Sequence, residues 1–158
     1  MDKIKCQCHF AGVHFVGLRQ IAAKGGPVLH MLRNDSPTLK KFGEVYFSEV
    51  FSGALKAWKR HREMTQHFVV PVGKVLLVMF DEREGSKTFG EVRECILGRP
   101  DHYNLLVIPP MVWYGFKCIS ENPALISNCT DMPHNPEESE HALPGDSRFP
   151  YDWKELKE

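Results

Sequence analysis

The sequence lacks an excess of charge of either sign. Its 20 lysines and arginines balance 20 aspartates and glutamates, so the formal net charge is zero at pH 7. No long basic run occurs, which gives nucleic-acid binding little electrostatic support. No apolar run reaches the roughly 18 residues of a membrane-spanning helix, and the charged N-terminus does not lead into the apolar core of a signal peptide. We therefore expect a cytoplasmic protein with neither nucleic acid nor membrane as a partner.

The chain of 158 residues has only five cysteines, an odd number that cannot all pair within one chain. Cys6 and Cys8 are too close for an easy disulfide, and the other cysteines lie in segments with a strand-like pattern. This indicates reduced thiols, as in a cytoplasmic protein. No internal repeat or low-complexity linker divides the chain, and the hydrophobic fraction of 42% is sufficient for a core. Residues 1–158 are therefore expected to form a single domain.

Short stretches of β-forming residues are what the sequence contains in abundance. Turn signals separate them, and there is no long amphipathic helix, a pattern typical of an all-β barrel or sandwich. The polar segment 133–145 reads as a surface loop. The predicted strands cover 13–18, 28–32, 45–51, 55–61, 65–72, 74–80, 91–97, 105–108, 112–118 and 124–128.

The central stretch 53–73 contains the most candidate functional residues. Strand 55–61, a short polar turn and strand 65–72 form a predicted hairpin that ends at Gly73, where glycine tolerates a positive φ. Side chains alternate along a strand, so Lys59 and His61 are expected to share one face and Arg60 the other. A lysine and a histidine should therefore point into the same space.

The spacing within this stretch resembles the first motif of the cupins. Gly53 and Gly73 match its glycines and His61 its second histidine, whereas Lys59 takes the place of the first histidine and Gln66 that of the glutamate. A protonated lysine does not bind metal, and an amide is a poor substitute for a carboxylate ligand. The resemblance implies a double-stranded β-helix, the jelly-roll barrel of the cupins, with no cofactor and no metal.

Segment 107–116 resembles the second cupin motif, with Met111 in place of a glycine and Tyr114 in place of the last histidine ligand. Five segments, in order, are similar to one metal-free cupin family, the dTDP-4-dehydrorhamnose 3,5-epimerases. They are 53–59 (GALKAWK), 80–90 (FDEREGSKTFG), 108–116 (IPPMVWYGF), 128–131 (NCTD) and 151–153 (YDW).

This resemblance implies an isomerase that acts on a 4-keto nucleotide sugar. In the family, a histidine oriented by an aspartate removes a proton beside the C4 ketone, a lysine lies at the enolate oxygen, and a tyrosine returns a proton. The base position corresponds to Lys59 here, and the enolate lysine to Gln66 or, shifted by one residue, to His67. The acid position corresponds to Ser127 and the orienting aspartate to Asp146.

A site can still be assembled from the residues that are present. His61 is the imidazole nearest the base position, and Tyr114 can replace the acid. Lys59 can act as a base if burial lowers its pKa, or can stabilise an enolate while charged. We expect His61, Lys59, Tyr114 and Asp146 to be catalytic. The expected substrate-binding residues are Lys24, Glu49, Lys56, Arg60, Gln66, His67 and Ser127.

Two of these lysines correspond to arginines that contact the nucleotide in the resembled family. They are Lys24 in the turn 23–27 and Lys56 in the central stretch. Family members pair through their barrels, so the resemblance implies a homodimer in which residues 1–45 complete the interface.

Two other functions remain open at this point. One is a non-catalytic cupin that binds a nucleotide sugar or supports a partner enzyme, and the other is a metal-dependent cupin. Each candidate side chain could instead be purely structural. The sequence does not decide which nucleotide and sugar are bound, whether C3 or C5 is epimerised, or whether Lys59 or His61 is the base.

Overall fold

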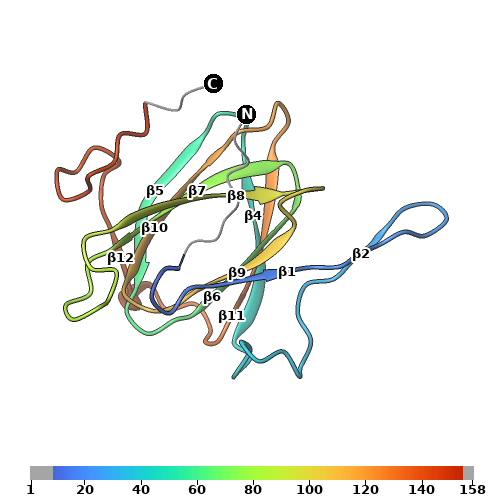
Figure 1. Ribbon diagram of the computed structural model, residues 1–158, viewed down its shortest axis with the longest axis horizontal. Helices are drawn as coiled ribbons and strands as arrows, with labels where there is room; N and C mark the ends of the chain where they lie inside the picture. The colour runs from blue at the N-terminus through green and yellow to red at the C-terminus, as the bar shows by residue number, and fades with distance from the viewer. Residues whose placement is uncertain (1–8, 155–158) are drawn as a thin grey trace.

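The computed structural model describes residues 9–154, which form two facing antiparallel β-sheets (Figure 1). The first sheet has the order β1 (His14–Gly17), β9 (Asn104–Ile108), β6 (Gln66–Val72), β11 (Ala124–Thr130) and β4 (Glu44–Val50). The second has the order β12 (Ser139–His141), β5 (Leu55–His61), β10 (Val112–Cys118), β7 (Lys74–Asp81) and β8 (Val92–Gly98). The expected all-β jelly-roll barrel is confirmed.

A ribbon of two short strands, β2 (Gln20–Ile21) and β3 (Val28–Leu29), projects away from the barrel (Figure 1). The strand predicted over 28–32 is therefore shorter than expected. Met31 and Leu32 instead pack against the outer face of the first sheet, beside Val69 and Leu105. Packing on the sheet, rather than strand pairing, accounts for the apolar character of this segment.

The main apolar core lies between the two sheets. Strand β7 contributes to it with Val75, Leu77 and Met79, while Leu76 and Val78 belong to a second apolar cluster on the opposite face of the sheet. This explains the continuous apolar run at 75–80, because a strand covered on both faces needs no polar alternation. In the second cluster, Trp58 and Trp113 pack against the C-terminal Phe149 and Trp153.

Both strands of the hairpin predicted at the centre of the chain are present, but the hairpin itself is wrong, because β5 and β6 lie in different sheets and pair with other strands. Strand β5 spans Leu55–His61, as predicted, and Gly73 has φ +72°. A Cβ at Gly73 would lie 2.6 Å from the Cα of Ala124. Both the backbone conformation and the close approach of a neighbouring chain segment therefore require glycine here.

The segment 133–145 is more ordered than the predicted surface loop. It contains a 3₁₀ turn, Pro136–Glu138, followed by β12, which pairs with the edge of β5. Glu138 is buried, with 6% of its surface exposed. The loop prediction is wrong over 136–141, because pairing with a distant strand, rather than local apolar alternation, creates β12.

Candidate functional site

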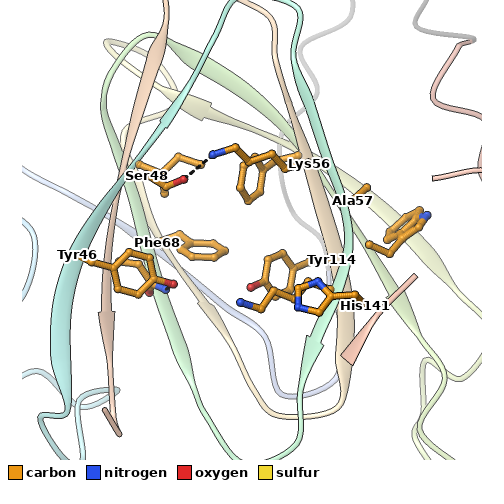
Figure 2. Close-up of a pocket in the computed structure, with 12 residues that line it drawn as sticks. Tyr46, Ser48, Lys56, Ala57, Phe68, Tyr114 and His141 are labelled. Atoms are coloured by element: carbon orange, nitrogen blue, oxygen red, sulfur yellow. Dashed lines mark hydrogen bonds between the residues drawn. The ribbon is translucent and has the colours of Figure 1, made fainter. Parts of the chain in front are cut away.

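A cavity of about 390 Å³ opens between the two sheets (Figure 2). Strands β4, β6 and β11 of the first sheet form one wall, and β5, β10 and β12 of the second form the other. Phe68, Phe116 and Ile126 contribute apolar surface. The polar side chains that line the cavity include Tyr46, Ser48, Lys56, Lys59, Tyr114 and Asn128.

A register shift in the second sheet places two lysines in this cavity. Tyr114 pairs with Lys59, but Phe116 pairs with Lys56, so β5 is one residue longer than β10 between these pairs. Strict alternation would put Lys56 and Lys59 on opposite faces, yet both line the cavity. Gly115 lies opposite the shift, and a Cβ there would lie 2.5 Å from the Cβ of Ala57.

Lys56 lies against the first sheet. Its Nζ donates to Ser48 Oγ at 3.0 Å (Figure 2). It also donates to the carbonyl of Glu49 at 2.9 Å. Both of these hydrogen bonds are exposed, so an anionic group could replace the two acceptors without leaving a buried atom unpaired. Lys56 is thus available to bind a phosphate group as a point charge.

The buried His61 lies between a carboxylate and a phenol. Its Nδ1 donates to Glu138 Oε1, since a carboxylate can only accept. Nε2 then accepts from the hydroxyl of Tyr114, 3.1 Å away. Backbone N–H groups of Glu63 and Met64 donate to Glu138 Oε2, each at 3.2 Å. These four bonds fix the tautomer and orientation of the imidazole.

Burial and neighbouring charges tune this group of residues. Desolvation lowers the pKa of His61 below 6.5, despite the opposing effect of Glu138. Lys59 and His141 lower the pKa of His61 further. The pKa of Tyr114 is raised well above 10, chiefly by burial. A neutral imidazole therefore accepts a hydrogen bond from a protonated phenol at neutral pH.

Lys59 also has a perturbed pKa. Burial lowers it below 10.5, and the Coulomb field of Glu138 partly offsets this effect. Lys59 lines the cavity, whereas His61 is only 4% exposed and reaches the cavity through the Tyr114 hydroxyl. The structure thus brings together three of the four expected catalytic residues, but Tyr114 and Lys59 line the cavity whereas His61 does not.

Gln66 is close to the cavity without lining it. Its Oε1 accepts from Asn128 Nδ2, which also donates to the hydroxyl of Tyr46 at 2.8 Å. Asn128 Oδ1 accepts from the backbone N–H of His67 at 3.0 Å, and this bond fixes the orientation of the amide. Gln66 therefore acts on the cavity through Asn128.

His67 and Ser127 face away from the cavity. The ring nitrogens of His67 lie 2.9 and 3.0 Å from the carbonyl oxygens of Cys129 and Thr38, and Ser127 Oγ contacts Met31 Sδ at 3.2 Å. Strand alternation explains both positions, because their neighbours Phe68 and Asn128 point inward.

Arg60 and Asp146 are also outside the cavity. The guanidinium of Arg60 lies over the Trp113 ring and pairs with Glu82 and Glu140. Asp146 pairs with Arg148 at 3.0 Å. The carboxylate that orients His61 is Glu138, and not Asp146.

The remaining two predicted binding residues are on exposed parts of the chain. Lys24 lies in the turn between β2 and β3, and Glu49 is exposed on β4. Within one chain, only Lys56 among the predicted substrate-binding residues lines the cavity.

Sequence reasoning missed several residues of the site. Tyr46 and Ser48 alternate along the predicted strand 45–51, and this alternation could have identified them as a pair on one face. Asn128, which lines the cavity, directly follows the predicted Ser127. Glu138 had no comparable signal, because it lies in a polar segment far along the chain from His61.

Among residues 9–154, no group of three or more His, Cys, Asp and Glu side chains could hold a metal ion. Both ring nitrogens of His61 already have partners.

Residues 9–154 include no helix with the length and apolar character of a membrane span. Cys118 and Cys129 are buried free thiols, and Cys6 and Cys8 lie outside the described residues.

Comparisons with known proteins agree with this architecture. A family model described as dTDP-4-dehydrorhamnose 3,5-epimerase matches residues 48–158. The probable low-salt glycan biosynthesis epimerase Agl13 of Haloferax volcanii is 32% identical over 145 residues, covering 89% of each chain. The spore coat polysaccharide biosynthesis protein SpsL of Bacillus subtilis is 31% identical over 141 residues, again covering 89% of each chain.

A solved structure shows the same fold at higher identity. The dTDP sugar isomerase from Desulfovibrio desulfuricans G20 is 53% identical, with a TM-score of 0.91, and the match covers 93% of this chain and 94% of that one. The family model alone spans more than half of the sequence. The chain therefore belongs to the dTDP-4-dehydrorhamnose 3,5-epimerase family.

Proposed function

We propose that this protein is an isomerase that removes a proton beside the C4 ketone of a 4-keto nucleotide sugar. One observation carries the proposal: Tyr114, hydrogen-bonded to the His61–Glu138 pair, lines the same cavity as Lys59. Proton abstraction next to a ketone needs a proton acceptor and a group that stabilises the enolate oxygen. The 53% identity to a dTDP sugar isomerase supports this class of reaction.

The geometry divides these roles between the residues. The proton leaves the sugar carbon for the oxygen of Tyr114 while the hydroxyl proton of Tyr114 moves to His61 Nε2. The imidazolium that forms is stabilised by Glu138. Lys59, as an ammonium group in a partly buried cavity, stabilises the enolate oxygen. Lys56 is placed to hold a phosphate of the nucleotide.

Solvent exchange tests the proposed function directly. The protein is incubated in deuterium oxide with a panel of 4-keto nucleotide sugars, and the recovered sugars are analysed by mass spectrometry and NMR. We expect deuterium at C3 or C5 of at least one sugar. Binding without exchange would reject catalysis and support a non-catalytic cupin that binds a nucleotide sugar.

The role of Lys59 can be separated by mutation from the proton transfer between Tyr114 and His61. If its ammonium group holds the substrate oxygen, Lys59→Met should weaken both nucleotide-sugar binding, measured by calorimetry, and deuterium exchange. If Lys59 is the base, exchange alone should fall. Lys87→Met, at an exposed lysine outside the cavity, is the matched control and should change neither quantity.

We also propose that the protein is a cytoplasmic homodimer. Val28 on the projecting ribbon and Phe47 on the edge strand β4 are 55% and 64% exposed, an unusual exposure for apolar side chains on strands. A second copy would cover these surfaces and could bring Lys24 to a neighbouring cavity. Buried free thiols at Cys118 and Cys129 fit a reducing compartment.

Light scattering at micromolar concentration should give twice the chain mass of 18.1 kDa. Phe47→Glu should produce a folded monomer, because a charge on each copy would be buried in the interface. Glu49→Ala, which changes an exposed residue on the same strand without adding a charge, serves as the control. A monomeric unaltered protein would contradict the proposed assembly.

A further inference from the structure

A second tyrosine faces the cavity from the sheet opposite Tyr114. Tyr46 lies on β4 of the first sheet, whereas Tyr114 lies on β10 of the second, and both line the cavity (Figure 2). The inversion of a carbon centre needs proton transfer on both faces of the sugar ring. Two hydroxyls on opposite walls have the arrangement that this reaction requires.

The hydrogen bonds of the two hydroxyls have opposite polarity. Tyr114 donates its proton to His61 Nε2, so its oxygen offers a lone pair to the cavity. The oxygen of Tyr46 instead accepts from Asn128 Nδ2 at 2.8 Å. Because Asn128 Oδ1 is held by the backbone N–H of His67, this direction is fixed. Among residues 9–154, the hydroxyl proton of Tyr46 has no acceptor.

We propose that Tyr46 is the proton donor on the face of the sugar ring opposite Tyr114. This inference rests on the proposed function. In the first step Tyr114 takes the carbon-bound proton while its own hydroxyl proton passes to His61 Nε2, and the electrons of the broken C–H bond form the enolate. In the second step the hydroxyl bond of Tyr46 breaks, its proton adds to the same carbon from the other side, and the enolate collapses to the ketone.

The two tyrosines differ in their contact with solvent, and this difference allows each hydroxyl to return to its starting protonation state after a reaction cycle. Tyr46 is 37% exposed, so its phenolate can regain a proton from water. Tyr114 is 4% exposed, and its proton passes to and from His61. Water supplies one proton and receives one in each cycle, so the protons balance. Burial and the charge of Glu44 raise the pKa of Tyr46, although the hydrogen bond from Asn128 lowers it. The raised pKa keeps the hydroxyl of Tyr46 protonated, as a proton donor must be.

This assignment also accounts for the departure at Ser127. Ser127 occupies the position of the family's acid but faces away from the cavity, toward Met31. Tyr46 pairs with Asn128, the residue after Ser127, on the neighbouring strand. A phenol from β4 thus borders the cavity where β11 contributes the amide of Asn128 and the apolar side chain of Ile126.

Replacing Tyr46 with phenylalanine separates deprotonation from inversion. In deuterium oxide with a sugar that the unaltered protein epimerises, Tyr46→Phe should keep deuterium exchange within a few-fold, because Tyr114 can still remove and return the proton on one face. Formation of the inverted sugar should fall roughly a hundred-fold or more. Tyr103→Phe removes a hydroxyl that donates to the carbonyl of His30 outside the cavity, and should leave both rates unchanged.

Asn128→Asp provides a second test without removing the phenol. The introduced carboxylate would accept the proton of Tyr46, turning it away from the substrate, and should likewise reduce inversion more than exchange. Normal inversion by Tyr46→Phe, or equal losses of exchange and inversion, would overturn the role proposed for Tyr46 but leave the proposed function standing. No exchange by the unaltered protein on any sugar would reject the proposed function and this role with it. Thermal unfolding identifies any variant that fails to fold.

Discussion

His61→Asn is expected to slow deuterium exchange about a hundred- to ten-thousand-fold while nucleotide-sugar binding remains nearly unchanged. The neutral imidazole is the group that receives the proton of Tyr114, and an asparagine amide cannot hold that extra proton. Asparagine retains hydrogen-bonding groups beside Glu138, so the fold should survive. Exchange by NMR and binding by calorimetry measure the two effects.

His134→Asn, at an exposed histidine, is the control for this substitution. A pH profile adds a second readout. Burial lowers the pKa of His61, and the facing Lys59 and His141 lower it further, while Glu138 opposes them. Exchange should therefore persist as the pH falls through 6.5 and decline only below it, when His61 becomes protonated. Full exchange by His61→Asn together with its loss in Lys59→Met would identify Lys59 as the base.

Asp81→Asn is expected to destabilise the protein by about 3–5 kcal/mol, the usual cost of breaking a buried ion pair. Asp81 is fully buried and accepts from Arg83 Nε at 2.8 Å, Ser86 Oγ at 2.6 Å and Thr88 Oγ1 at 2.6 Å. Arg83 also donates to the carbonyl of Ala11, at 2.6 Å. An amide would leave the guanidinium without its charged partner and remove one acceptor oxygen.

Denaturant unfolding at pH 7 measures this loss. Asp146→Asn is the matched control, since Asp146 pairs with an arginine two residues later but is 27% exposed, and it should be far less destabilising. Burial alone would raise the pKa of Asp81, but hydrogen bonds from Arg83, Ser86 and Thr88 lower it well below 3.8. The stability that Asp81 contributes should therefore be present above pH 4 and fall with pH only below it. Similar small losses in both variants would contradict this account.

The barrel and the individual strands of its central stretch were predictable because they depend on local pattern, whereas the assignment of β5 and β6 to opposite sheets was not. Strand β5 and the turn glycine Gly73 appear where alternation and turn chemistry place them. The continuous apolar run of β7 also predicted its burial on both faces. A few neighbouring residues determine each of these features, and the two-residue alternation of side chains along a strand is sufficient to predict them.

The composition of the site was only partly predictable, because it depends on pairing between distant strands. The shift between β5 and β10 that brings Lys56 into the cavity is a property of both strands together. The predicted Ser127 faces away from the cavity while the next residue, Asn128, lines it, because one position along a strand reverses the direction of a side chain. Glu138 reaches His61 only after β12 has paired with β5, and no local pattern indicates that contact.

The late position of Glu138 in the chain has a consequence for the nascent protein during synthesis. His61 emerges from the ribosome long before the carboxylate that sets its tautomer, and Phe149 and Trp153, which cover the outer face of the second sheet, emerge later still. A partly synthesised barrel therefore has an imidazole without its orienting partner and an apolar face without its cover. Acquisition of a competent proton relay and protection from aggregation should thus occur in the same final stage of folding.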